Sequence, residues 1–197
     1  MAAQTLPFWL ETPAAIPAVR AAELAPPAMS QPFALDEVLA TLRPRLSAEL
    51  LTHVEARAHV AAWRDLSRRA LEQNVFFEPE FVLAAAQHFA MARKPRFILV
   101  WEETHGHRRL IGLCPVLLPR RGWTGIAWIW RHAQSSSGTP LLDAGMASEA
   151  LAQVLACLRA AAPHAEALLA PRLAADGPTA ALLRAHAASA GRPARSF

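Results

Sequence analysis

Apolar residues recur with a helical period in the segment that follows residue 59. The apolar positions are Val60, Trp63, Leu66, Ala70 and Leu71. Charged residues fill most of the positions between them, as they do on the solvated face of an amphipathic helix. The pattern therefore predicts a helix over 60–71, and Asn74 marks its end.

A second helix is predicted to begin at the sequence Glu78-Pro79-Glu80. Proline is tolerated in the first turn because its missing N–H has no partner there, and acidic side chains favour the positive end of a helix. Apolar residues then continue to residue 89, which gives the expected length.

Three strands are predicted in the middle of the chain. Residues 97–101 are apolar and rich in β-branched and aromatic side chains, the polar segment 102–109 reads as a turn, and 110–118 reads as the return strand. Pro115 cannot donate to a ladder, so the return strand must bulge, bend or turn that position to an edge. Residues 126–130 form the third strand, and 44–54 fits an opening strand or a helix.

After a polar loop over 131–140, the pattern predicts a helix over 148–161, a strand or short apolar segment over 165–173, and a last helix that starts at 176–179 and ends at residue 190. This order of elements predicts an α/β (α+β) fold with a mixed sheet flanked by helices. The expected organisation is a Pro/Ala-rich leader over 1–42 with one short helix at 34–41, a domain over 43–192, and a tail over 193–197.

The charge of the chain argues against a nucleic-acid partner. The sequence pI is about 10.3, yet 19 arginines and one lysine against 16 acidic residues leave a net charge of only +4. The arginines are scattered and form no basic stripe with exposed aromatic residues, which is the usual footprint of a phosphate-binding surface.

The same sequence gives no sign of export or of a membrane span. The first 35 residues lack a basic start followed by an apolar run, and the apolar segment 110–130 is interrupted by prolines, arginines and glycines. The two cysteines, Cys114 and Cys157, are too few for a disulfide framework and read as small buried apolar residues. A cytoplasmic location is expected.

The segment 74–81 contains the first candidate for chemistry. It combines three aromatic residues, including Phe77, with two carboxylates at a helix start. A glutamate among apolar side chains can serve as a general base, so Glu78 is the candidate catalytic residue. The structural alternative is that these acids only favour the helix N-terminus and the aromatic residues only fill the core.

The segment 130–143 is the second candidate, because it leaves a strand end, gathers hydroxyl groups in a loop and precedes a helix. The candidate binding residues there are Trp130, His132, Ser137, Gly138, Thr139 and Asp143. An ordinary polar loop is the alternative, and the G-x-S-x-G sequence of a serine nucleophile is absent. His105 and His107 read as a solvated turn, and no metal site is predicted.

Three segments together resemble a known family. N-x-F-F-E-P-E-F at 74–81, R-L-I-G-L-C-P-V-L at 109–117, and W-R-H followed by G-T-P-L-L-D at 130–143 resemble the cellulose-biosynthesis CelD-like acyltransferases, which are tandem-GNAT relatives of the FemAB-like transferases. The resemblance covers about 40–192 and implies the first of two GNAT-like halves, with a sheet that lacks its last strands.

The resemblance implies an acyltransferase component that moves an acyl group from acetyl-CoA or another acyl-CoA to an amine or hydroxyl of a sugar or polysaccharide precursor. This half would shape the acceptor cleft, with Glu78 as base or acceptor contact and Asp143 capping or bracing the loop. The residues lining the pocket would be Trp130, His132, Ser137, Gly138 and Thr139. A second GNAT half would be the partner, and an open edge strand makes self-association a further hypothesis.

Two departures keep a second function open. The [QR]-x-x-G-x-[GA] loop that holds the acyl-CoA pyrophosphate in GNAT enzymes has no match here, and the chain has no tyrosine, which many of these enzymes use as a general acid. The alternative is a non-catalytic, truncated GNAT-like module that binds a partner or packs on another half.

Overall fold

The computed structural model describes residues 44–89, 94–119 and 125–195. Every described residue belongs to the second of the chain's two units, Thr41–Phe197. The predicted leader and its short helix over 34–41 lie outside the described residues, as do the last two residues of the predicted tail.

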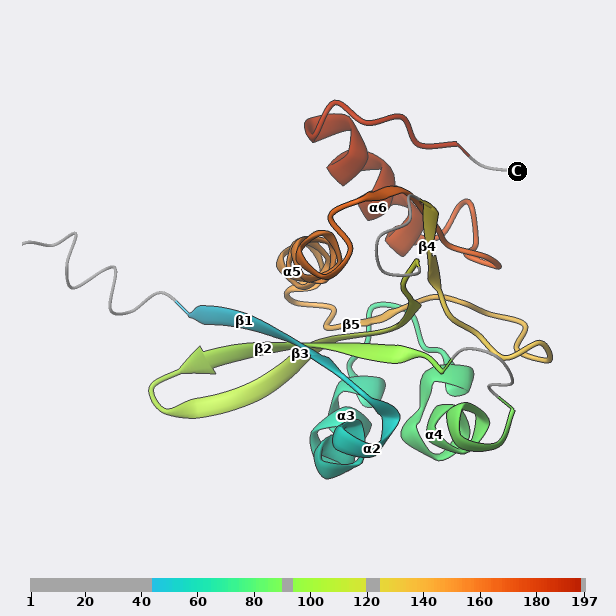
Figure 1. Cartoon of the computed structure of the whole chain (residues 1–197). Helices are drawn as coiled ribbons and strands as arrows, with labels where there is room; N and C mark the ends of the chain where they lie inside the picture. The colour runs from blue at the N-terminus through green and yellow to red at the C-terminus, as the bar shows by residue number, and fades with distance from the viewer. Residues whose placement is uncertain (1–43, 90–93, 120–124, 196–197) are drawn as a thin grey trace, which may run out of the picture. The chain divides into compact units, whose positions relative to one another are not determined.

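The second unit is built on a mixed sheet of six strands (Figure 1). The strands are β1 (Arg45–Leu51), β2 (Arg96–Thr104), β3 (His107–Leu117), β4 (Gly125–Ile129), β5 (Leu141–Leu142) and β6 (Ala165–Leu169). Their order is β1-β2-β3-β4-β6, and β5 also pairs with β3. Every pair is antiparallel except β4 with β6, which is parallel. The predicted mixed sheet with flanking helices is therefore confirmed.

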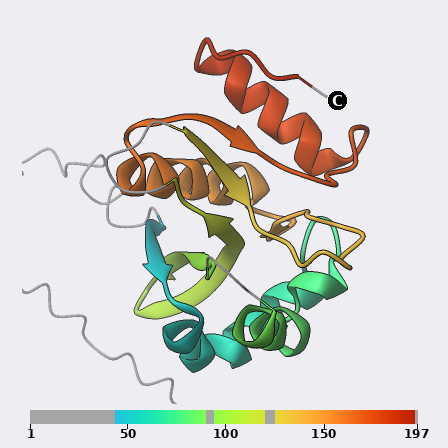
Figure 2. The ribbon, with the colours of Figure 1, turned by 45° about the vertical axis from the view of Figure 1, so that its right-hand side comes forward.

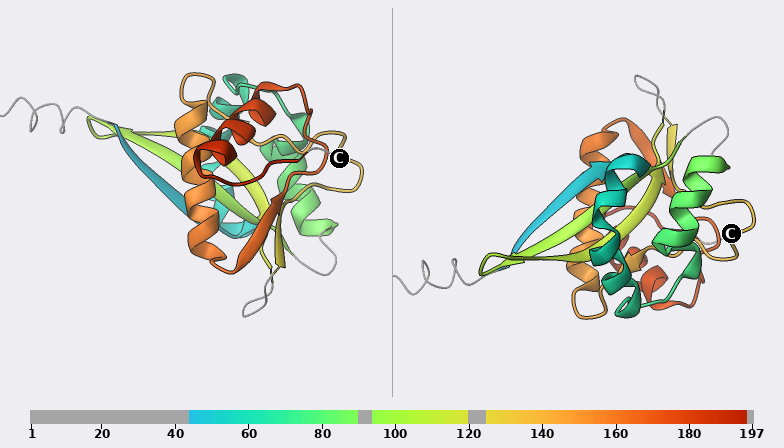
Figure 3. Two further views of the ribbon diagram at one scale, coloured as in Figure 1. Left: turned by 90° about the horizontal axis from the view of Figure 1, so that it is seen from above. Right: turned by 90° about the horizontal axis from the view of Figure 1, so that it is seen from below.

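Helices cover both faces of this sheet (Figures 1 and 3). One face carries α2 (His53–Ala56), η1 (Arg57–His59), α3 (Val60–Arg68), η2 (Val75–Phe77) and α4 (Pro79–His88). The opposite face carries α5 (Ala147–Ala161), which crosses β1, β2 and β3, and α6 (Pro178–Ser189) packs against α5 (Figure 2). Because both faces are covered, the apolar run from Phe97 to Trp101 is buried along its whole length.

The core has one layer on each side of the sheet. From α5 it takes Leu151, Val154 and Leu158, and from α3 it takes Trp63 and Leu66. Each of these side chains is at most 5% exposed. The apolar helix faces predicted from the sequence therefore pack against the sheet. Burial of such an apolar stripe stabilises an amphipathic helix.

The hairpin between β2 and β3 is longer than predicted. Residues 102–104 and 107–109 belong to the strands, and Glu102 lies opposite Arg109 as Glu103 lies opposite Arg108. Opposite charges across an antiparallel pair favour pairing, so polar residues extend the strands here. The turn itself is His105 and Gly106, both with positive φ (51° and 79°).

The first predicted long helix ends earlier than its apolar period. α3 stops at Arg68 because Ala70 forms a β-bridge with Asp143 and the N–H of Leu71 donates to the carbonyl of Leu142 at 2.7 Å. Asn74 does not end this helix. Its side chain caps η2 instead, accepting from the N–H of Phe76 at 3.1 Å.

The strand alternative for 44–54 is confirmed as far as Leu51, where a capping box between Thr52 and Glu55 starts α2. The predicted segment 165–173 forms a strand only as far as Leu169. Residues 170–177 then lead into α6, and no strand follows β6 in the described part of the chain. The two-residue strand β5 was not predicted.

Candidate functional site

The loop 131–140 interrupts a strand that would otherwise be continuous. Ile129 at the end of β4 pairs with Val116, and Leu141 in β5 pairs with Leu113, so β4 and β5 run along the same edge of β3 in the same direction. The chain leaves that edge after Trp130, whose N–H donates to the carbonyl of Pro115 at 2.8 Å.

Pro115 explains where the strand breaks. The N and C=O of one strand residue point to the same side, so the missing N–H of Pro115 faces β4 and β5. The position opposite that missing donor is where the chain departs into the loop. The sequence left open whether the strand bulges, bends or turns this nitrogen to an edge. β3 lies inside the sheet, and the nitrogen of Pro115 faces the gap between β4 and β5, where the candidate loop begins.

The loop packs on the segment after β6. The N–H of Gly138 donates to the carbonyl of Arg172 at 3.2 Å. A Cβ atom at residue 138 would lie only 2.2 Å from the carbonyl oxygen of Pro171, so only glycine permits this approach. The loop therefore lies at the carboxyl ends of the parallel strands β4 and β6, where open α/β sheets bind ligands.

Two of the candidate hydroxyl groups are hydrogen-bonded to each other. The Ser137 hydroxyl donates to Thr139 Oγ1 at 3.1 Å and accepts from the N–H of Thr139 at 3.2 Å. Thr139 is buried, and its carbonyl accepts from the Asn74 side chain at 2.8 Å. These groups hold the loop in shape and connect it to the start of η2.

Asn74 was not predicted to belong to the site, although it connects the site's two halves. It is 4% exposed, caps η2 through its side-chain oxygen and donates from its side-chain nitrogen to Thr139. An asparagine just before an aromatic run is a capping signal that the sequence offered, but the distant partner could not be read from it.

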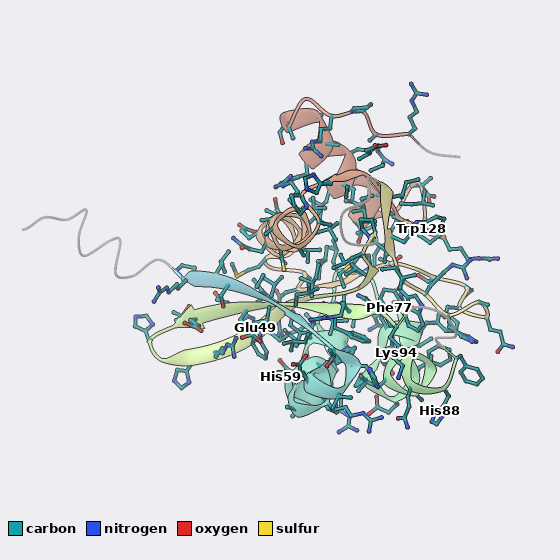
Figure 4. All side chains as sticks on the ribbon, in the orientation of Figure 1. Glu49, His59, Phe77, His88, Lys94 and Trp128 are labelled. Atoms are coloured by element: carbon teal, nitrogen blue, oxygen red, sulfur yellow. The ribbon has the colours of Figure 1, made fainter. Side chains whose placement is uncertain are left out.

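Phe77 and Glu78 are neighbours with opposite environments. Phe77 is fully buried between the sheet and α4 (Figure 4), and its carbonyl accepts from the Trp63 indole at 2.8 Å. Glu78 is exposed and stands at the N-cap of α4, but its side chain makes no capping hydrogen bond. Phe77 therefore belongs to the core, and the carboxylate of Glu78 is available to solutes.

His132 lies in an aromatic cluster, which consists of Phe76, Phe81, Phe89 and His132. The imidazole centre is 4.9 Å from the Phe89 ring and 6.3 Å from the Phe81 ring, and Phe76 and Phe81 are 5.2 Å apart. His132 Nδ1 also accepts from the N–H of Gln134 at 3.3 Å. Phe89 is 60% exposed, so the cluster is open to solvent. Trp130, by contrast, is buried.

Asp143 is buried in a charge network away from the hydroxyl groups of the loop. Its carboxylate pairs with Arg69 and lies 3.4 Å from the Arg109 guanidinium, and it accepts from the N–H of Gly145 at 2.9 Å. Arg69 also donates to the carbonyl of Leu110 at 2.5 Å. The carboxylate thus braces the turn between β5 and α5.

A hollow of about 370 Å³ opens between α3 and the first turn of α4. Its lining residues are Arg64, Ser67, Arg68, Gln73, Glu78, Pro79 and Glu80. Of the predicted site residues, Glu78 lines this hollow. Every lining residue except Pro79 is polar, and the charged ones carry both signs.

The structure brings together part of the predicted site. The hydrogen bond from the Asn74 side chain to the Thr139 carbonyl connects the residues around Glu78 to the loop. The aromatic cluster connects α4 to His132. Asp143 has a separate network. Among the described residues, no group of three His, Cys, Asp or Glu side chains is arranged to hold a metal ion, and none of the helices there has the length and apolar character to cross a bilayer.

Comparison with known proteins gives no assignment. No family model matches the chain, and neither a curated protein nor a solved structure matches it. The fold and the site geometry therefore carry the functional argument.

Proposed function

We propose that this chain is a GNAT-type acyltransferase component whose described residues shape the acceptor side of the site. The observation that carries the proposal is the parallel pair β4–β6 at the end of an otherwise antiparallel sheet, with the loop 131–140 at its carboxyl ends. The sequence resemblance at 74–81, 109–117 and 130–143 adds the reaction class.

Glu78 is the proposed base. Its carboxylate is exposed, borders the 370 Å³ hollow and belongs to no ion pair within the described residues. In acyl transfer it would accept the proton that the acceptor amine or hydroxyl loses as its nitrogen or oxygen attacks the acyl carbonyl. The acceptor would be a small amine or hydroxyl compound, and the sequence resemblance implies one related to a sugar.

Two backbone N–H groups just before α5 are already hydrogen-bonded within the chain. A pyrophosphate bound at the start of α5 would need free backbone N–H groups. The N–H of Gly145 donates to the Asp143 carboxylate and that of Met146 to the Asp143 carbonyl. Following the sequence resemblance, we place most of the acyl-CoA site, as a proposal, on a second GNAT half.

A non-catalytic GNAT-like module is the second candidate. It is favoured by the hydrogen bonds within the loop 131–140. Ser137 and Thr139 hydrogen-bond to each other, and Gly138 packs tightly on Pro171. A loop whose polar groups are already paired offers less to a ligand. In this function the aromatic cluster and the loop would serve packing on a partner.

Thermal unfolding with acetyl-CoA and longer acyl-CoA thioesters tests whether this chain itself holds part of the acyl-donor site. A ligand that binds only the folded state stabilises it by about 2.7 kcal/mol at a hundredfold excess over Kd, which raises the Tm by several degrees. A rise in Tm would assign part of the acyl-donor site to this chain. An unchanged Tm with every thioester, together with no acyl transfer when a second GNAT half is added, would argue for the non-catalytic module.

Any preparation that transfers acyl groups then allows a test of Glu78. Glu78→Gln removes the base and is expected to lower kcat by about 100-fold. Glu149→Gln makes the same charge change on an exposed position of α5 and should keep the full rate. Full activity of Glu78→Gln would remove this residue from the chemistry.

A further inference from the structure

The hollow between α3 and α4 has a size that suits a small ligand. Small-molecule sites begin at volumes of about 300 Å³, and one water takes about 30 Å³ of liquid. At about 370 Å³ the hollow could hold a molecule of monosaccharide size. The two helices that form its walls lie side by side on one face of the sheet (Figure 3).

One wall of the hollow is a single stripe of α3. Arg64, Ser67 and Arg68 are three and four residues apart, so they share one face of the helix. The opposite wall is the first turn of α4, which contributes Glu78 and Glu80. Opposite charges therefore face each other across the opening.

Only some of these charges neutralise each other. Arg64 pairs with Glu80 at 2.5 Å, with both side chains 55% exposed. A hydrogen bond from its own backbone N–H and, next, one from the Arg64 guanidinium lower the pKa of Glu80, so this pair stays ionised near neutral pH. Arg68 and Glu78 have no ion-pair partner in the described part of the chain.

The charged side chains of Arg68 and Glu78, which have no ion-pair partner among the described residues, define which ligands the hollow could bind. A guanidinium donates charge-assisted hydrogen bonds to a carboxylate or phosphate, and a carboxylate accepts them from an ammonium group. The Gln73 amide can donate and accept. The Ser67 hydroxyl donates to the Trp63 carbonyl at 3.1 Å and keeps its lone pairs for a hydroxyl of a ligand.

We propose that this hollow binds a small molecule that carries both a protonated amine and an acidic group, with the amine at Glu78 and the acidic group at Arg68. The assignment of this molecule as the acyl acceptor rests on the proposed function, whereas its binding does not. As acceptor, the amine would lose one proton to solvent before it attacks, and Glu78 beside it would accept the second.

Binding of three probes to the full chain tests the proposal. Glucosamine 6-phosphate carries both charges, glucosamine only the amine, and glucose 6-phosphate only the acidic group. The doubly charged probe is expected to bind about fivefold more tightly than either of the others at low ionic strength, and salt should weaken it. Isothermal titration or ligand-detected NMR measures these affinities without any acyl donor.

Two variants test which side chain binds the amine of the ligand and which binds its acidic group. Glu78→Gln should lower the affinity for glucosamine 6-phosphate about fivefold and leave that for glucose 6-phosphate unchanged, while Arg68→Gln should leave the affinity for glucosamine unchanged. Glu149→Gln and Arg159→Gln make matched charge changes on α5, across the sheet, and should change nothing.

Equal affinity for the three probes, or equal effects of the α5 variants, would overturn the proposal. So would the absence of binding at concentrations up to about 10 mM by a chain that unfolds cooperatively. Because these measurements need no acyl-CoA, a failed transfer assay with intact probe binding would count against the proposed function alone.

Discussion

Among the candidate residues, Asp143 is the one whose carboxylate has two ion-pair partners. Its side chain is 6% exposed and pairs with Arg69 and Arg109, whose side chains are 25% and 45% exposed. Removing one partner of a buried pair leaves an uncompensated charge, but the exposure of the arginines reduces the cost.

We expect Asp143→Ala to lower the free energy of unfolding by about 2 kcal/mol. Asp65→Ala is the matched control, because Asp65 pairs with the same Arg69 from a side chain that is 56% exposed. That change should cost less than about 0.5 kcal/mol. Urea unfolding of both variants measures the difference, and equal losses would refute the role given to Asp143.

Cys114 provides a prediction for alkaline pH. Complete burial raises the pKa of its thiol to about 12 from an ordinary value of 9.0. A group whose pKa is raised on folding stabilises the fold fully below the unfolded pKa, and this contribution is lost as pH rises from there through the folded pKa. The chain has no tyrosine and one lysine, so few other side chains titrate in this window.

Above pH 9, the wild type should therefore lose stability relative to Cys114→Val by up to about 1.4 kcal/mol per pH unit. Urea midpoints measured between pH 7 and pH 10.5 would show the divergence. Cys157 is only half-buried, and burial raises its pKa too, so Cys157→Val should give a smaller effect. Parallel pH profiles for wild type and Cys114→Val would contradict the prediction.

At the scale of elements, local signals predicted where most helices and strands lie. Pro79 marked the start of α4, and the change of period at residue 96 marked β2. The end of α3 and the strand β5 were missed because both depend on the pairing of residues 70–71 with 142–143, far away in the sequence. A helical period cannot show such a partner.

Gly138 shows how the loop depends on a distant element. Gly138→Ala would place a Cβ atom 2.2 Å from the Pro171 carbonyl, so the backbone must move. We expect a loss of about 2 kcal/mol in the free energy of unfolding. At Gly125 the nearest atom to a Cβ, on Pro119, is 3.4 Å away, so Gly125→Ala should cost little. Equal stability of the two variants would show that the loop does not pack on Pro171 in solution.

At the scale of the molecule, the sheet ends in strands that have a neighbour on one side. Within the described residues, β1 pairs only with β2, and β6 only with β4. Ala167 of β6 is exposed, as are Ile126 and Trp128 of β4, and Trp128 is labelled in Figure 4. Unpaired backbone beside apolar side chains favours pairing with another chain.

We therefore expect the chain to self-associate as its concentration rises, as measured by light scattering. Ala167→Lys places a charge at the β6 edge and should shift the equilibrium toward monomer. Ala161→Lys adds the same charge to an exposed position of α5 and should not. A monodisperse monomer at every concentration would count against pairing through this edge.

The sequence by itself determined the class of fold and the place of a carboxylate at the start of α4, because period, proline chemistry and helix termini are local properties. Tertiary structure alone decided the rest. It separated Phe77 from Glu78, placed Asp143 between Arg69 and Arg109, and opened the hollow lined by Arg68. These contacts join residues that only the pairing of strands and the packing of helices bring together, so no local pattern could predict them.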